Sequence, residues 1–121
     1  MTVHLKKLSV GSETLESLII RQKQVLDAGS PLLHPTRNWP RRKDELLDGG
    51  SLYWIIKGQM VARQLIKEFV EISQIDGKPR CGIVLAPGLI PVWPKKVRLF
   101  QGWRYLEETD VPADIPIDDT D

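Results

Sequence analysis

The first hydrophobic pattern along the chain is a strict alternation. Val3 and Leu5 alternate with His4 and Lys6 within residues 2–9. Because successive side chains of a strand point to opposite faces, this alternation predicts a strand with one buried face.

After a Gly-Ser break, the hydrophobic spacing changes to that of a helix. Ser12 is a good helix-capping residue, and Glu13 and Glu16 place negative charge where a helix begins. Apolar positions then recur three and four residues apart as far as Ala28 and Gly29, where we expect the helix to end.

Prolines dominate the next segment. Pro31, Pro35 and Pro40 predict a loop over residues 30–40, because proline lacks an amide donor and disfavours helix at the residue before it. A short helix is expected over residues 41–48, where two glycines follow.

Residues 51–57 are rich in β-formers and predict a buried strand. Tyr53 and Trp54 would point to opposite faces of that strand, so at most one of them joins the core on a given side. One of them would line a pocket, or both would be core residues, which the size of aromatic side chains favours.

Residues 60–72 are ambiguous between strand and helix, because their apolar pairs recur every four residues. The turn signal Asp76-Gly77 favours a hairpin of residues 65–73 against residues 80–86, with a β-bulge near Arg63. We favour the hairpin and keep the helix as its alternative.

Residues that interrupt regular secondary structure occur again in the last third of the chain. Pro87, Gly88, Pro91 and Pro94 argue against a long regular element in this region. A last strand is expected within residues 97–106.

The length of 121 residues and the hydrophobic fraction of 41% fit one globular domain. The pattern predicts an α+β fold: a small, mostly antiparallel sheet or open barrel with two helices. The domain is expected over residues 1–106. Residues 107–121 form an acidic tail rich in Asp, Pro and Thr, for which we expect disorder.

The charge is unevenly distributed along the chain. All 17 Lys and Arg residues lie in residues 1–106, whereas seven of the 16 Asp and Glu residues lie in the tail. A basic body with an acidic tail is typical of a polyanionic partner, or of a tail that covers a basic face. The alternative is a tail that only keeps the protein soluble.

Basic and aromatic residues are interleaved in two places, within residues 34–43 and near residue 103. Guanidinium groups pair with phosphate, and an indole offers a face on which a base can stack. We therefore expect RNA or single-stranded nucleic acid as a partner. The candidate binding residues are Arg37, Trp39, Arg41, Arg42, Lys43, Trp54, Lys57, Arg63, Trp103 and Arg104.

Two other functional classes stay open. One is a protein-interaction or small-ligand module in which the acidic tail acts as a lid or a docking peptide. The other is an enzyme acting on a nucleotide or phosphorylated metabolite, which has the least support because no catalytic or metal motif is present. Cys81 is the single cysteine and is expected to be buried and inert, and no cofactor is expected.

No apolar run approaches the roughly 18 residues that a membrane span needs, so no membrane partner is expected. We find no apolar signal segment behind the first charges, and the expected compartment is the cytoplasm. The sequence leaves the oligomeric state open.

Three segments carry a family resemblance. The segment of residues 44–58 reads DELLDGGSLYWIIKG, and residues 3–8 and 100–106 read VHLKKL and FQGWRYL. With these segments the chain resembles the alphaproteobacterial family catalogued as domain of unknown function 1489. The resemblance implies a bacterial cytosolic protein and carries no activity with it.

A looser, fold-level likeness is to the PUA-like domains, including their ASCH and EVE relatives. It implies a small curved barrel with a pocket for RNA or a modified base.

Overall fold

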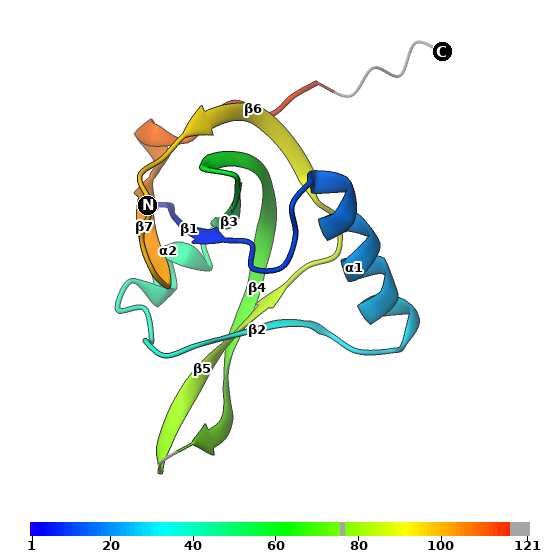
Figure 1. Cartoon of the computed structure of the whole chain (residues 1–121). Coiled ribbons are helices and arrows are strands. Elements are labelled where there is room, and N and C mark those ends of the chain that lie inside the picture. The colour runs from blue at the N-terminus through cyan, green and yellow to red at the C-terminus, as the bar shows by residue number, and fades with distance from the viewer. Residues whose placement is uncertain (76, 117–121) are drawn as a thin grey trace.

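The computed structural model describes residues 1–75 and 77–116. These residues contain two α-helices, which lie between the first three strands, four further strands, and a short 3-10 helix (Glu108–Asp110) after the last strand (Figure 1). The elements are β1 (Val3–Leu8), α1 (Leu15–Asp27), β2 (Leu32–Thr36), α2 (Lys43–Leu46), β3 (Ser51–Ile56), β4 (Gln59–Ile75), β5 (Lys78–Leu85), β6 (Ile90–Lys96) and β7 (Trp103–Glu107).

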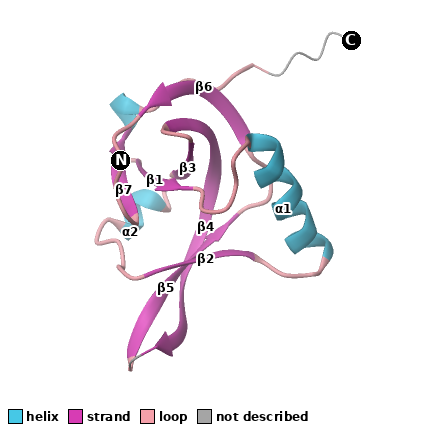
Figure 2. Ribbon diagram, in the orientation of Figure 1, coloured by secondary structure: helices cyan, strands magenta, loops and turns pink. Residues whose placement is uncertain are grey.

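The strands form one mostly antiparallel sheet in the order β2-β5-β4-β3-β1-β7, with β6 paired to β4. Only the β1–β3 pair is parallel within the described residues. β4 is long enough to pair with β3 and β6 in its first part and with β5 in its second. The sheet does not close, and the β4–β5 ribbon projects from the body (Figure 2). This confirms the α+β fold with two helices.

Tyr53 and Trp54 confirm that β3 has two buried faces. Trp54 belongs to the larger core, with Leu5, Leu52 and Ile83 among its members. Tyr53 belongs to a second core formed with Ile55, Met60, Val92 and Leu106. All six residues of β3 are buried, so this strand is the centre of the fold.

Helix α1 is fixed to the sheet by a buried pair of amides rather than by its apolar side chains alone. Gln22 Nε2 donates to Gln64 Oε1 at 2.8 Å, and Gln64 Nε2 donates back to Gln22 Oε1 at 2.9 Å. Ile19 and Leu26, two apolar residues within the spacing that predicted this helix, are exposed. No helix in the described part of the chain is long and apolar enough to cross a membrane.

The helix begins later than predicted. Its cap is Thr14, whose Oγ1 accepts a hydrogen bond from the Ser17 amide at 3.0 Å, while the Ser17 hydroxyl accepts one from the Thr14 amide. This reciprocal capping box satisfies two amides, which Ser12 cannot do two residues earlier. The Ser12 hydroxyl is instead buried without a hydrogen-bond partner in the described structure.

Two proline-rich segments that we expected to be irregular are strands. Residues 30–40 contain β2, in which Pro35 lies opposite Gly82 of β5, and residues 90–96 form β6 despite Pro91 and Pro94. β2 lies at the end of the sheet and β6 lies off its main order. A proline costs no ladder hydrogen bond where its missing amide faces away from the neighbouring strand.

The hairpin prediction is confirmed, and residues 60–72 are strand rather than helix. β4 pairs with β5 from Ile66↔Leu85 to Ile72↔Arg80. The register shift on β4 falls between Met60 and Ala62, so the extra residue is Val61, two positions from Arg63 and near the predicted bulge. Of the predicted turn, Asp76 lies outside the described residues.

The remaining elements are shorter than predicted or shifted. The second helix spans four residues rather than 41–48, and the last strand begins only at Trp103. Residues 107–116, for which we expected disorder, pack on the body: the Trp93 amide donates to Ala113 O and the Ile115 amide to Pro91 O, both at 2.9 Å. The expected disorder of residues 117–121 falls outside the described residues.

Candidate functional site

The antiparallel β1–β7 pair has a cavity at each of its ends. Val3 pairs with Glu107 at one end and Lys7 with Trp103 at the other. We call the cavity beside Trp103 the Trp103 cleft and the cavity beside Tyr53, where the C-terminal segment crosses the start of β1, the Tyr53 pocket.

The Trp103 cleft has a volume of about 520 Å³. It forms where the ends of β1 and β2 meet the loop before β7, and its main lining residues are Lys7, Arg37, Asn38, Gln101, Trp103 and Arg104. The Trp103 indole N–H donates to Asn38 O at 3.2 Å, which fixes the ring against the loop after β2. The Arg104 guanidinium donates to Gln101 O at 2.9 Å and to Trp103 O at 3.0 Å.

The cleft is positively charged. None of its described lining residues is acidic. Lys7 occupies an inward-facing position of β1 after Val3 and Leu5, and its burial lowers the pKa of its ammonium group without a carboxylate to counter the effect. The pKa of His34 falls to about 4 through burial, with a smaller contribution from Lys7 and Arg21, so His34 is neutral at pH 7.

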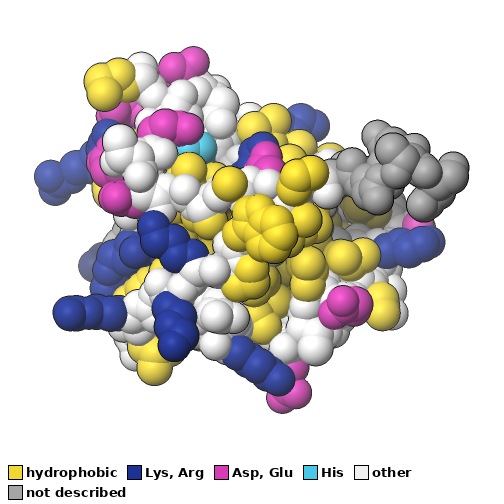
Figure 3. Space-filling view, turned by 90° about the horizontal axis from the view of Figure 1, so that it is seen from above, with side chains coloured by type: hydrophobic (Ala, Val, Ile, Leu, Met, Phe, Trp, Pro, Cys, Tyr) yellow, Lys and Arg dark blue, Asp and Glu magenta, His cyan; other side chains and the backbone are white. Residues whose placement is uncertain are grey.

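A second basic region continues from the cleft around the loop before β7. The Phe100 ring lies between Lys6 Nζ, 5.7 Å from its centroid, and the Arg104 guanidinium at 5.2 Å. Next to this region, a hollow between β6 and β7 is lined by the cations Lys6, Lys95, Lys96 and Arg98 and by the acids Glu107 and Asp110. Figure 3 shows Lys and Arg side chains gathered along one side of the face seen there.

Of the ten predicted binding residues, Arg37, Trp103 and Arg104 meet in the Trp103 cleft. Trp39 and Lys43 form a separate pair on the surface, with Lys43 Nζ 5.7 Å from the centre of the indole ring. The other five lie elsewhere: Arg41, Arg42, Trp54, Lys57 and Arg63.

Three of these five have partners that account for their chemistry. Arg42 is bound by Glu45 at 2.8 Å and by Glu107 at 2.6 Å, and both carboxylates raise the pKa of its guanidinium. Trp54 is only 2% exposed and its indole N–H donates to Gln64, so it cannot stack on a base. Arg63 belongs to the Tyr53 pocket. Arg41 and Lys57 are exposed on a loop and on the β3–β4 turn.

Lys7 is the cation of the cleft that the prediction did not include. The sequence could have indicated Lys7. The alternation of Val3 and Leu5 continues to position 7, where the pattern predicts an apolar residue and the chain has a lysine. A cation at an inward-facing strand position is uncommon unless it is paired or functional.

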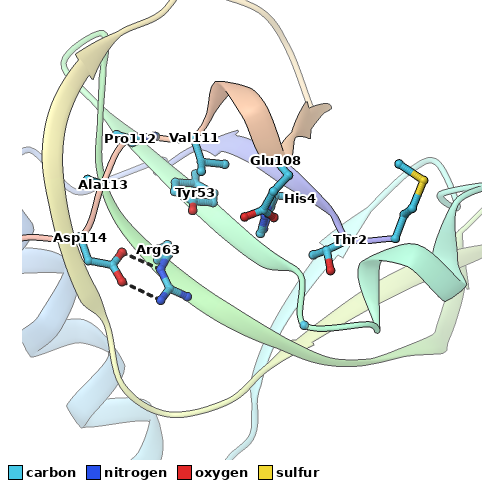
Figure 4. A pocket seen from close by; sticks show the side chains of 11 residues that line it. Thr2, His4, Tyr53, Arg63, Glu108, Val111, Pro112, Ala113 and Asp114 are labelled. Carbon is cyan, nitrogen blue, oxygen red and sulfur yellow. Dashed lines mark hydrogen bonds and ion pairs between the residues drawn. The ribbon is translucent and has the colours of Figure 1, made fainter.

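The Tyr53 pocket has a volume of about 600 Å³ (Figure 4). His4 is buried at its base, where its Nδ1 accepts the Ser51 amide at 2.9 Å and its Nε2 lies 2.5 Å from Glu108 Oε2. Because Nδ1 accepts, the ring proton is on Nε2 and is donated to Glu108. The Tyr53 ring meets His4 edge-on at 5.3 Å, and burial raises the pKa of its phenol to about 12.

Arg63 closes the other side of this pocket. Its guanidinium binds Asp114 through two hydrogen bonds of 2.7 and 2.8 Å and donates a third, of 3.0 Å, to the Ser51 hydroxyl. The ion pair lowers the pKa of Asp114 and raises that of Arg63. This two-pronged pair joins the C-terminal segment to β4 across 51 positions of the sequence.

Neither cavity offers a metal site. Within the described residues there is no cluster of three or more His, Cys, Asp or Glu side chains that could hold an ion. Cys81 is buried as predicted, and burial raises the pKa of its thiol, which disfavours the reactive thiolate.

Comparison with known proteins gives one match. Residues 5–121 match the family described as "Protein of unknown function (DUF1489)". No curated protein and no solved structure matches the chain. Because the family match covers nearly the whole chain, this protein belongs to the DUF1489 family.

Proposed function

We propose that the protein binds single-stranded nucleic acid, RNA or single-stranded DNA, in the Trp103 cleft. The observation that carries this proposal is Lys7, a half-buried ammonium group in a cleft whose described lining residues include no acid. Arg37 and Arg104 add two further cations to the same cleft.

The argument from Lys7 is energetic. Burying a charge without a partner costs free energy. An anion that pairs with the buried charge offsets this cost, and the offset contributes to the free energy of binding the anion. The paired cations on this protein, Arg42 and Arg63, show the other arrangement, in which carboxylates of the chain itself already satisfy the guanidinium. An anionic ligand is therefore the natural partner of the unpaired group.

The remaining lining residues favour a nucleic acid over a simple anion. Trp103 is partly exposed and held in place by its bond to Asn38, so its ring can stack on a base with little loss of side-chain entropy. The side chains of Asn38 and Gln101 carry both donors and acceptors that suit the edge of a base. Arg37 and Arg104 are suited to phosphate.

The basic hollow between β6 and β7 extends this surface. Lys6 is the register partner of Arg104 and shares Phe100 with it. A strand that stacks on Trp103 would thus meet Lys95, Lys96 and Arg98 as it continues past Phe100. We expect a site of several nucleotides rather than one.

Tryptophan fluorescence during titration with oligo(U) and oligo(dT) decamers tests the proposal. We expect quenching at low salt that weakens as salt rises. If only the three cations of the cleft meet phosphates, the slope of log K against log salt should be about −2, and contacts in the hollow would steepen it. Trp103→Phe should lose most of the quenching, whereas Trp93→Phe, which removes a 56% exposed indole on β6, should retain it.

Quenching that persists in Trp103→Phe would place the nucleic acid elsewhere. Binding without salt dependence, or no binding to either decamer at low salt, would overturn the proposed function.

A further inference from the structure

We infer that the Tyr53 pocket is a binding site for a small organic cation, an ammonium or amidinium compound with an apolar group. The inference is independent of nucleic-acid binding, because the pocket lies at the opposite end of the β1–β7 pair from the Trp103 cleft. It assigns a role to side chains that the proposed function does not use.

The charges around the pocket leave one carboxylate uncompensated. Arg63 and Asp114 neutralise each other in their two-pronged pair. The amino group of Met1 lies 3.5 Å from Asp48, which forms a second neutral pair at the rim. His4 accepts the Ser51 amide at Nδ1 and is therefore the neutral tautomer, so it gives Glu108 a hydrogen bond but no positive charge.

Two acceptors of the pocket are available to a ligand. His4 engages Glu108 through Oε2, which leaves Oε1 without a hydrogen-bond partner among the described residues. The Tyr53 phenol stays protonated at physiological pH and keeps a lone pair on its oxygen. In Figure 4 the Tyr53 hydroxyl and the Glu108 carboxylate lie around the same opening. A ligand with several N–H donors on one cationic group can bind both.

Part of the remaining wall is apolar. Val111, Pro112 and Ala113 cross the pocket, and Tyr53 contributes its ring. A cavity of about 600 Å³ is in the range of small-molecule sites, which combine a largely apolar lining with a few placed polar groups. The ligand class is therefore a compact aryl or alkyl group that carries the cation at one end.

The C-terminal segment supplies half of this site. Glu108 and residues 111–114 form one wall, and this wall is held by the His4 bond, the Arg63 pair and the backbone bonds to β6. The pocket exists only while the segment is docked. Ligand binding should therefore stabilise the docked segment by mass action.

Three probes of nearly identical shape test the sign of the charge: benzamidine, benzamide and benzoate. Their binding can be followed by the amide shifts of ¹⁵N-labelled protein. We expect benzamidine to shift the amides of residues 108–114, benzamide to bind at least tenfold more weakly, and benzoate not to bind. Glu108→Gln should weaken benzamidine at least tenfold while keeping the His4 bond, because the amide oxygen still accepts.

Glu68→Gln is the matched control, since it removes the same charge from an exposed position of β4 outside the pocket and should leave affinity unchanged. Tyr53→Phe keeps the ring and should weaken benzamidine at least threefold, which provides a test that does not alter Glu108. The inference is wrong if no probe binds, if benzoate binds as well as benzamidine, or if benzamidine binds both variants as tightly as it binds the native protein.

Discussion

The two ends of the β1–β7 pair place charge in opposite ways. At the Tyr53 end, Arg63 is paired with Asp114 and His4 with Glu108, so the cation and the imidazole are each held by a carboxylate of the C-terminal segment. At the Trp103 end, Lys7, Arg37 and Arg104 line a cleft without an acidic residue among its described lining. At the Tyr53 end the cation is already held by a carboxylate of the chain, whereas the described lining of the Trp103 end offers its cations none.

The comparison shows that a count of basic residues is a poor guide to a binding surface. Arg42, Arg63 and Arg104 are the same residue type in one small domain, yet two of them are used to hold the fold together. What distinguishes a cation free to bind phosphate is the absence of a carboxylate within reach in the folded chain.

The largest expected effect comes from reversing charge at the Trp103 end. Lys7→Glu combined with Arg104→Glu should weaken binding of an oligo(U) decamer by about 100-fold at low salt, because two phosphate contacts become repulsions. The control, Lys23→Glu combined with Lys67→Glu, makes the same change of net charge on α1 and β4 and should cost less than about threefold. Equal losses in both double variants would show that only net charge matters.

Removing the charge of Lys7 alone should separate binding from stability. In Lys7→Met, affinity for the decamer should fall about tenfold, while the free energy of unfolding in urea should rise by up to about 1 kcal/mol because a half-buried charge is replaced by an apolar chain. Lys67→Met, at an exposed position, should change neither quantity appreciably. A clear loss of stability in Lys7→Met would mean that the ammonium group has a structural partner after all.

At the Tyr53 end, Asp114→Asn should lower the free energy of unfolding by about 0.5–1 kcal/mol at pH 7, since the Arg63 pair is partly exposed. Arg63 lowers the folded-state pKa of Asp114 below the ordinary value of 3.8, so the contribution is present above that value and is lost as the pH falls through the folded pKa. The difference between the two proteins should therefore be the same at pH 7 and at pH 5 and should shrink once the pH falls below 3.8 toward the folded pKa of Asp114. Urea unfolding over this pH range measures the difference in the free energy of unfolding between the native protein and the variant. A difference that grew on acidification would contradict the ion pair of Arg63 with Asp114.

The smallest effect is expected for a cation that is already paired. Arg42→Gln should change affinity for the decamer less than about twofold, because Glu45 and Glu107 already occupy its guanidinium. Arg37→Gln, which removes a cation of the cleft, should cost about fivefold. Fluorescence titrations of the two variants side by side would sharpen the distinction, and the reverse order of effects would refute it.

Local patterns predicted the elements whose determinants are local. The alternation at Val3 and Leu5, the β-formers of residues 51–57 and the turn behind β4 each correspond to an element of the fold. β2 and β6 could not be predicted from their prolines, because a proline is acceptable only where the strand lies in the sheet in a particular way. The place of β2 and of β6 in the sheet is decided by pairing with residues distant in the sequence.

Contacts between residues distant in the sequence also decide which of the predicted binding residues belong to the site. Arg37, Trp103 and Arg104 were predicted because basic and aromatic residues cluster in the sequence. Arg63 was placed in the same set because its carboxylate partner Asp114 lies 51 positions away, and the second partner of Arg42, Glu107, lies 65 positions away. No local pattern shows such a partner.

The position of β1 has a consequence for how the protein is made. Leu5 pairs with Leu52 on one side and with Tyr105 on the other, so β1 leaves the ribosome before both of its neighbours, which follow about 50 and about 100 residues later. Pairings this distant are slow to form, and an unpaired strand is exposed to aggregation until they do. We therefore expect β1 to stay incompletely paired until β7 has been synthesised, so that the sheet is completed only after β7 has left the ribosome.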